Sequence, residues 1–127
     1  MRILIADHDL RVRAALRLLL IEEDDAAMVA DCADLEGLAR QWQDFEPDLV
    51  LLDWELPGRP ASAFLLARNT AARPKLIVLS TRLEYRSVAL ASGADAFVFK
   101  ADPPELLLRA CREVMRIRPR QSPVDTG

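Results

Sequence analysis

Four polar side chains follow four apolar runs in this sequence, and together their types indicate phosphoryl chemistry. Asp7 ends the run ILIAD, Asp53 ends DLVLLD, Ser80 ends KLIVLS and Lys100 ends AFVFK. Parallel strands buried on both faces are continuous runs of Val, Ile and Leu, and ligand sites in open α/β sheets lie beyond the carboxyl ends of the strands. Two carboxylates, a hydroxyl and an ammonium at one sheet edge would form a site for a phosphoryl group and a divalent cation.

The residue types also suggest how these groups would divide the chemistry. Neighbouring ionised carboxylates repel each other, and a bound divalent cation relieves this repulsion; oxygen ligands suit Mg²⁺, which takes one or two carboxylates and keeps several waters. Asp53 would then attack a phosphoryl donor and become an aspartyl phosphate. The cation and Lys100 would stabilise the charge on the phosphoryl oxygens, and the Ser80 hydroxyl would hydrogen-bond one of them. Taken singly, each residue has a plainer interpretation as a helix cap or a surface lysine; the combination predicts a site.

The elements that must position these residues alternate along the chain. We expect strands at residues 2–6, 27–32, 48–52, 75–79 and 95–99, and helices at 9–21, 34–45, 61–71, 81–91 and from about 102 to 117. Strands separated by helices imply right-handed crossovers and a parallel sheet. The predicted fold is therefore α/β, a flavodoxin-like doubly wound (βα)5 three-layer sandwich with strand order 2-1-3-4-5. In this order Asp7 and Asp53 would face each other at the switch point.

Local signals mark several helix ends. Asp34 and Asp102 are expected N-caps, the latter followed by proline at the first helical position. Thr81 with Glu84 three residues later fits a capping box, and Gly93 is expected to end the helix that follows. These signals place the polar residues above in loops at the strand ends.

Composition narrows the functional class. A chain of 127 residues, 51% hydrophobic, is the common size of one domain, which we place at residues 1–118, with a flexible tail or the start of a linker at 119–127. A net charge of −3 argues against sequence-independent nucleic-acid binding. Cys32 and Cys111 lack CxxC spacing and are expected to be buried thiols. Without a membrane-length apolar stretch or a signal-peptide pattern, we expect a cytoplasmic protein.

The order and spacing of these motifs resemble the receiver domain of bacterial two-component response regulators. The similarity covers residues 2 to about 117 and is carried by ILIAD, PDLVLLDWELPG, LIVLS, ASGADAFVFK and PPELLLRA, of which DLVLLDWELPG is highly specific. It implies that a histidine kinase or histidine phosphotransfer protein donates a phosphoryl group to Asp53 with the help of Mg²⁺. This role requires Asp53 to be an accessible anion. It makes the domain a signalling module, not an enzyme beyond phosphotransfer to itself and its own dephosphorylation.

The resemblance assigns further roles by position. Asp7 would be a metal ligand together with the phosphoacceptor carboxylate and the main-chain carbonyl of Glu55. Ser80 and Lys100 would contact the phosphoryl group. Ser80 and Phe97 would also form the switch that biases the surface of helix 4, strand 5 and helix 5.

The acid pair of the family departs from its usual form, because the sequence has Asp7-His8 where two acids are usual. Imidazole is a poor ligand for Mg²⁺. His8 is then either a tolerated, half-exposed substitution or a functional change that weakens metal binding or introduces a pH-driven switch. Asp9 could supply the missing ligand but is also the expected N-cap of the first helix. We therefore expect weaker Mg²⁺ binding than in a receiver with two acids.

Three further departures or additions concern the same edge of the sheet. The Glu55 side chain either overhangs the site, adding negative charge, or is a solvated loop acid. Lys100 precedes Ala101 where many relatives carry a proline in a cis peptide, and cis and trans are both admissible here. Trp54 is expected to be partly exposed beside the metal site.

Two other functions remain open from the sequence. The run Asp7-His8-Asp9 also resembles the nucleophile motif of haloacid-dehalogenase-type phosphatases, although the rest of that family's pattern is missing. Alternatively, the chain is a receiver-shaped interaction module that no longer takes phosphate. As partners we expect a histidine kinase or a histidine phosphotransfer protein, with a homodimer left open, and neither a membrane nor direct binding of nucleic acid by this domain.

Overall fold

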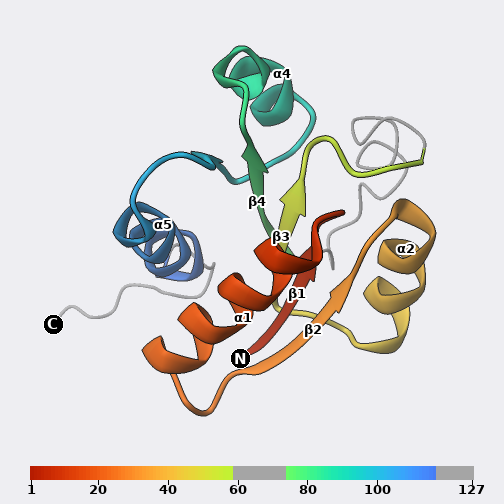
Figure 1. Cartoon of the computed structure of the whole chain (residues 1–127), viewed down its shortest axis with the longest axis vertical. Helices are drawn as coiled ribbons and strands as arrows, with labels where there is room; N and C mark the ends of the chain where they lie inside the picture. Colours follow the sequence, from red (N-terminus) through yellow and green to blue (C-terminus); the bar gives the residue numbers. More distant parts are fainter. Residues whose placement is uncertain (59–73, 117–127) are drawn as a thin grey trace, which may run out of the picture.

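The computed structural model describes residues 1–58 and 74–116 of the chain (Figure 1). Its sheet contains five parallel strands in the order β2-β1-β3-β4-β5, which confirms the predicted order. The strands are β1 (Arg2–Ala6), β2 (Met28–Cys32), β3 (Leu49–Asp53), β4 (Lys75–Ser80) and β5 (Ala96–Phe99). They agree with the expected strands to within one residue at each end.

Helices cover both faces of this sheet. They are α1 (Leu10–Glu23), α2 (Leu35–Asp44), α4 (Arg86–Ala91) and α5 (Pro104–Arg116), with a 3-10 turn η1 (Leu83–Tyr85) before α4. In Figure 1, α1 and α5 lie on one side of the sheet and α2 on the other. The helix expected at 61–71 lies outside the described residues. No helix in the described ranges combines the length and apolar character that a membrane crossing requires.

The core consists of two apolar layers, one on each side of the sheet. Successive residues of β3 alternate between them: Val50 and Leu52 pack beneath α2 and α4, and Leu49 and Leu51 pack beneath α1 and α5. All four side chains are fully buried. Because both faces are covered, the interior positions of the central strands are apolar on both sides, which is why the sequence pattern located them.

Most helix ends follow the expected signals. The Asp34 carboxylate accepts a hydrogen bond from the Gly37 amide at 2.8 Å and caps α2. Gly93 has a φ of +119° after the end of α4. Two hydrogen bonds, from its amide to Leu90 and from the Ala94 amide to Ala89, complete a Schellman end of that helix.

The capping box predicted at Thr81 and Glu84 is wrong. The turn η1 begins at Leu83, after an extended Arg82 that makes no side-chain cap. Glu84 bonds instead to the Arg82 guanidinium at 2.9 and 3.1 Å. The last helix begins at Pro104, one residue later than predicted, and the assignment of Asp102 as its N-cap is wrong because Asp102 lies two residues before the helix.

Candidate functional site

The carboxyl ends of four strands bring the expected polar residues to one edge of the sheet. Asp7 follows β1, Asp53 ends β3 and Ser80 ends β4, and their side chains are 1%, 0% and 0% exposed. Lys100 follows β5, where its amide bonds to the Ser80 carbonyl at 2.8 Å and so continues the strand pairing. The Lys100–Ala101 peptide is trans. Backbone pairing thus fixes where each of these side chains starts.

Lys100 joins the two buried carboxylates. Its Nζ lies 2.7 Å from Asp7 Oδ2 and 3.3 Å from Asp53 Oδ1. Burial lowers the pKa of Lys100, but the contacts with the two carboxylates outweigh this effect and raise it. Conversely, burial raises the pKa of Asp53, whereas hydrogen bonding from His8 and the charge of Lys100 bring it below its ordinary value. The phosphoacceptor candidate is therefore an anion at neutral pH.

His8 covers this anion. Its Nδ1 lies 2.6 Å from Asp53 Oδ2 and 3.8 Å from Asp7 Oδ1, while about half of the side chain, 52%, is exposed to solvent. The hydrogen bond with Asp53 raises the pKa of His8, against a smaller opposing effect of burial. The expectation of an accessible Asp53 carboxylate is therefore wrong for this structure, because the imidazole and the Lys100 ammonium close over it.

The main chain holds the same two carboxylates from the other side. Asp53 Oδ1 accepts from the Glu55 amide at 3.0 Å, and Asp7 Oδ1 accepts from the Asp9 amide at 2.9 Å. The Asp9 carboxylate accepts from the Arg11 amide at 2.9 Å and caps α1. Among the described residues, the potential metal ligands whose atoms lie within 4.8 Å of one another are Asp7, His8 and Asp53. Asp9 serves as the helix cap and lies outside this group.

The hydrogen bonds of the Ser80 hydroxyl go to Glu55 and Arg82, and not to Asp53. The hydroxyl donates to Glu55 Oε2 at 2.7 Å and accepts from the Arg82 amide at 3.0 Å. Of the two interpretations of Glu55, the overhanging side chain is therefore the one observed. Sequence reasoning did not foresee this partner for Ser80, since the two residues are 25 positions apart. The spacing carries no signal for it.

The loop after Asp53 is fastened to α2. The Leu35 amide donates to the Pro57 carbonyl at 3.0 Å. Gly58, with a φ of +126°, follows at a point where a Cβ would lie 2.8 Å from the Leu35 Cβ. Trp54 begins this loop and is partly exposed, as expected; its ring centroid lies 6.4 Å from that of Tyr85. Trp54 thus follows Asp53 directly in the sequence, and its indole ring lies beside Tyr85 of η1.

Phe97 lies in β5, paired with Val78 of β4. Its ring is partly buried against the apolar layer beneath α2 and α4.

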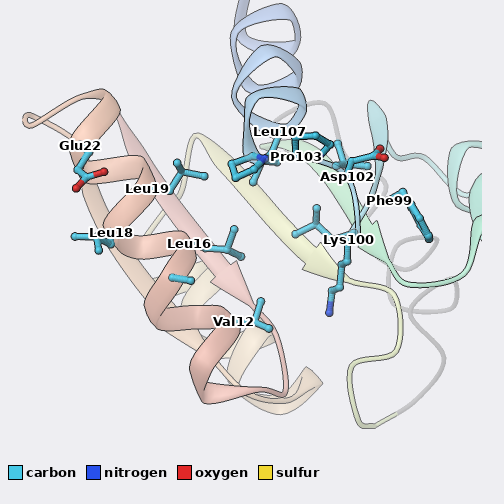
Figure 2. A pocket seen from close by; sticks show the side chains of 14 residues that line it. Val12, Leu16, Leu18, Leu19, Glu22, Phe99, Lys100, Asp102, Pro103 and Leu107 are labelled. Atoms are coloured by element: carbon cyan, nitrogen blue, oxygen red, sulfur yellow. The ribbon is translucent and has the colours of Figure 1, made fainter.

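An apolar groove adjoins the site, which the sequence analysis did not predict. It has a volume of about 400 Å³ and lies between α1 and the β5–α5 connection (Figure 2). Val12, Leu16 and Leu19 line one wall and Leu107 the other, while Lys100 lies at one end with its ammonium directed away from α5. The sequence signal was the excess of leucines in the first helix, where Leu18 is 60% exposed.

Comparison with known families identifies this arrangement. The model of the response regulator receiver domain matches residues 3–112. The chain belongs to this family. As a receiver domain of a two-component response regulator, it has the flavodoxin-like fold that its sequence predicted. Membership leaves the haloacid-dehalogenase-type interpretation of Asp7 without support.

Relatives of this receiver are longer proteins. A protein-glutamate methylesterase/protein-glutamine glutaminase of Rhodopseudomonas palustris is 33% identical over 96% of this chain and 38% of its own length. The oxygen regulatory protein NreC of Staphylococcus aureus is 30% identical over 91% of this chain and 55% of its own length. The chain thus spans about half, or less, of these relatives.

Solved structures agree on the fold. A DNA-binding response regulator of the LuxR family from Staphylococcus aureus superposes with a TM-score of 0.79 at 26% identity, over 89% of this chain and 97% of that one. The BeF3-activated receiver domain of Klebsiella pneumoniae RstA superposes with a TM-score of 0.80 at 23% identity, over 91% and 99% of the two chains. The second likeness concerns the fold alone.

Receiver domains generally bind Mg²⁺ at an acidic pocket, and the donor set here fits that cation in part. Asp7 and Asp53 offer hard carboxylate oxygens of the kind that Mg²⁺ prefers. The third group within reach, His8, offers nitrogen, which suits Mg²⁺ poorly, and its bond to Asp53 Oδ2 occupies one of the carboxylate oxygens. The carboxylates fit the cation, and the imidazole competes with it.

Proposed function

We propose that this receiver accepts a phosphoryl group on Asp53 from a histidine kinase or a histidine phosphotransfer protein. The observation that carries the proposal is the state of the Asp53 carboxylate. It is an anion with a lowered pKa, and the Lys100 ammonium lies 3.3 Å from its Oδ1. A carboxylate nucleophile must be ionised, and positioned positive charge stabilises a phosphoryl group in transfer.

The transfer balances with the groups of this site. The N–P bond of the donor's phosphohistidine breaks as an Asp53 oxygen forms the new O–P bond. The donor imidazole keeps the electron pair and takes up a proton, while Asp53 becomes an acyl phosphate. Lys100 would hold one phosphoryl oxygen throughout. This division of roles uses side chains that already contact Asp53 or lie next to it.

Asp7, Asp53 and the main-chain carbonyl of Glu55 would hold the divalent cation, Mg²⁺ by family resemblance. When bound, the cation supplies positive charge to the phosphoryl oxygens. His8 must turn away from Asp53 Oδ2 before a phosphoryl group can approach, and its half-exposed position leaves room in solvent for this movement. His8 is therefore the covering residue of the site, and Mg²⁺ binding is expected to be weak.

Ser80 would report the modification. Its hydroxyl proton, now shared with Glu55, would be donated to a phosphoryl oxygen, and Phe97 would follow the hydroxyl inward. These movements would bias the surface formed by α4, β5 and α5, the two-state element of the proposed switch. The apolar groove beside Lys100 supports a protein donor, because it offers a docking surface next to the reacting carboxylate.

The test is incubation with acetyl phosphate and Mg²⁺, followed by intact-mass measurement. We expect a mass increase of one phosphoryl group in the wild type and none in Asp53→Asn. A mass increase that persists in Asp53→Asn would place the modification elsewhere. A wild type that stays unmodified in the presence of Mg²⁺ and other divalent cations would refute the proposal.

The alternative is a phosphorylation-independent interaction module, and one observation favours it. The Asp53 side chain is 0% exposed beneath His8 and Lys100. His8→Ala distinguishes the two functions, since it removes the cover and keeps the carboxylate. If His8→Ala takes the phosphoryl group and the wild type does not, the carboxylate is competent and the imidazole blocks it.

A further inference from the structure

We propose that His8 makes this acid pocket select a divalent cation that binds imidazole nitrogen, such as Zn²⁺, in preference to Mg²⁺. The inference rests on the proposed function, because it concerns the cation of the same site. It goes further in assigning the imidazole as a ligand. The pocket would then be a mixed site of two carboxylates and one nitrogen.

The His8 imidazole points toward both carboxylates of the pocket. His8 Nδ1 is directed into the pocket and lies 2.6 Å from Asp53 Oδ2 and 3.8 Å from Asp7 Oδ1. An imidazole that was merely tolerated at a half-exposed position would have no need to turn inward. Together these three side chains form the one group of potential ligands within 4.8 Å found among the described residues.

The three ligand atoms are spaced almost as a bound Zn²⁺ would require. Two ligands bound about 2.1 Å from a tetrahedral Zn²⁺ lie about 3.4 Å apart. His8 Nδ1 and Asp53 Oδ2, 2.6 Å apart, would therefore separate by about 0.8 Å, and Nδ1 and Asp7 Oδ1, 3.8 Å apart, would approach by about 0.4 Å. A small rotation of the exposed His8 side chain accomplishes both changes without moving the strands.

Zn²⁺ and Mg²⁺ differ in the ligands that they prefer. Imidazole suits Zn²⁺ and Ni²⁺, whereas sites made of carboxylate, carbonyl and water suit Mg²⁺ and Mn²⁺. For Mg²⁺, His8 is a competitor that must leave Asp53. For Zn²⁺, the same side chain becomes a third protein ligand, and three ligands with an open position are typical of reactive zinc sites. One residue thus acts in opposite directions on the two cations.

Histidine and cysteine side chains elsewhere in the described residues are not expected to bind Zn²⁺ at neutral pH. His8 is the only histidine of the chain. Cys32 and Cys111 are free thiols, and burial raises their pKa to about 12 and about 11, so both are protonated at neutral pH. Zinc needs the thiolate. A zinc effect that depends on position 8 therefore reports the acid pocket.

The experiment compares wild type, His8→Asp and His8→Ala by calorimetric titration with Zn²⁺, Mn²⁺ and Mg²⁺, after circular dichroism has shown that all three fold. Because Zn²⁺ binds most mixed N/O sites more tightly than Mn²⁺, the measured quantity is the change in the affinity ratio. We expect His8→Asp to lower the Zn²⁺/Mg²⁺ ratio by about tenfold or more, as loss of a group that supports a metal site does. His8→Ala should weaken Zn²⁺ without weakening Mg²⁺.

Nitrogen-15 NMR of the single imidazole gives a second readout. Zn²⁺ should shift one ring nitrogen of His8, and Mg²⁺ should not produce that shift. An affinity ratio that is the same in all three proteins, or ring nitrogens unchanged at saturating Zn²⁺, would overturn the inference. Intact mass after acetyl phosphate treatment separates the two proposals. If the protein is phosphorylated but His8 does not bind Zn²⁺, the proposed function stands and this inference fails. If His8 binds Zn²⁺ but the protein is not phosphorylated, only this inference stands.

Discussion

The hydrogen bond between Ser80 and Glu55 should oppose the proposed contact between Ser80 and a phosphoryl group on Asp53. The Ser80 hydroxyl has one proton, which it donates to Glu55 Oε2 at 2.7 Å, and its oxygen accepts from the Arg82 amide at 3.0 Å. A phosphoryl oxygen is an acceptor and needs that same proton. Glu55 and a phosphoryl group on Asp53 must therefore compete for Ser80. Replacing Glu55 by alanine should favour the phosphoryl group.

The size of the effect follows from the bond. Hydrogen bonds to charged partners contribute about 1.5–3 kcal/mol. Glu55 is exposed, so water competes for its carboxylate and the lower value, about 1.5 kcal/mol, is appropriate. This free energy corresponds to about tenfold in an equilibrium constant. We expect Glu55→Ala to bind the phosphoryl analogue beryllofluoride, at fixed Mg²⁺, about tenfold more tightly, measured by Trp54 fluorescence. Glu55→Gln keeps an acceptor and should show a smaller increase.

A second background separates the hydrogen bond from simple charge repulsion. Without the hydroxyl, in Ser80→Ala, Glu55 has nothing to release, and only the repulsion between its carboxylate and the analogue remains. The effect of Glu55→Ala should therefore shrink in the Ser80→Ala background, as a double-mutant cycle measures. An equal gain in both backgrounds would refute the competition and leave repulsion as the whole explanation.

Three other predictions concern the covered carboxylates. The single histidine should titrate by NMR above its ordinary pKa of 6.5 because of its bond to Asp53, and Asp53→Asn should lower this pKa. Because the pKa of His8 is higher in the folded than in the unfolded state, the His8–Asp53 contact should contribute its full stability below the unfolded-state pKa. This contribution should disappear as the pH rises through the folded-state pKa. Urea unfolding of the wild type and of Asp53→Asn at several pH values measures it. Lys100→Met should cost about 3 kcal/mol in urea unfolding at neutral pH, because it leaves two buried carboxylates without their ammonium; Arg112→Met, which breaks an exposed ion pair, should cost under about 1 kcal/mol. Trp54 fluorescence should change when Mg²⁺ and beryllofluoride are added and stay constant in Asp53→Asn.

The backbone of the site was predictable because it depends on burial alone. Asp7, Asp53 and Lys100 each follow a run whose side chains alternate between two covered layers, so every position of the run is apolar and its end is marked by the first polar residue. Parallel pairing then delivers those ends to one edge. The sequence also located the N-caps at Asp9 and Asp34, since a carboxylate that accepts an amide within three residues is a local interaction.

The side-chain contacts were not predictable, because they join residues far apart in the chain. His8 and Asp53 are 45 residues apart, and Ser80 and Glu55 are 25 apart. Their bonds depend on rotamers that the strand pattern does not determine. The same limit explains the error at Thr81. The Ser80 hydroxyl accepts the Arg82 amide, and the helical turn begins at Leu83, one residue later than a capping box at Thr81 would require.

The net charge of the pocket relates the position of His8 over Asp53 to the proposed phosphorylation. When His8 is protonated, two carboxylates, Asp7 and Asp53, face two cations, Lys100 and the imidazolium, and the pocket is close to neutral without any ion. The bond to Asp53 raises the pKa of His8 and so favours this form. Mg²⁺ alone would leave it strongly positive, and phosphorylation alone would add about one negative charge, because the roughly two charges of the phosphate replace the single charge of the Asp53 carboxylate. Cation and phosphoryl group together keep the balance only if the imidazolium gives up its place or its proton. Protonated His8 therefore opposes binding of Mg²⁺ alone more than it opposes Mg²⁺ and a phosphoryl group together. We expect the His8 side chain to leave Asp53 in the same step in which Asp53 captures the phosphoryl group.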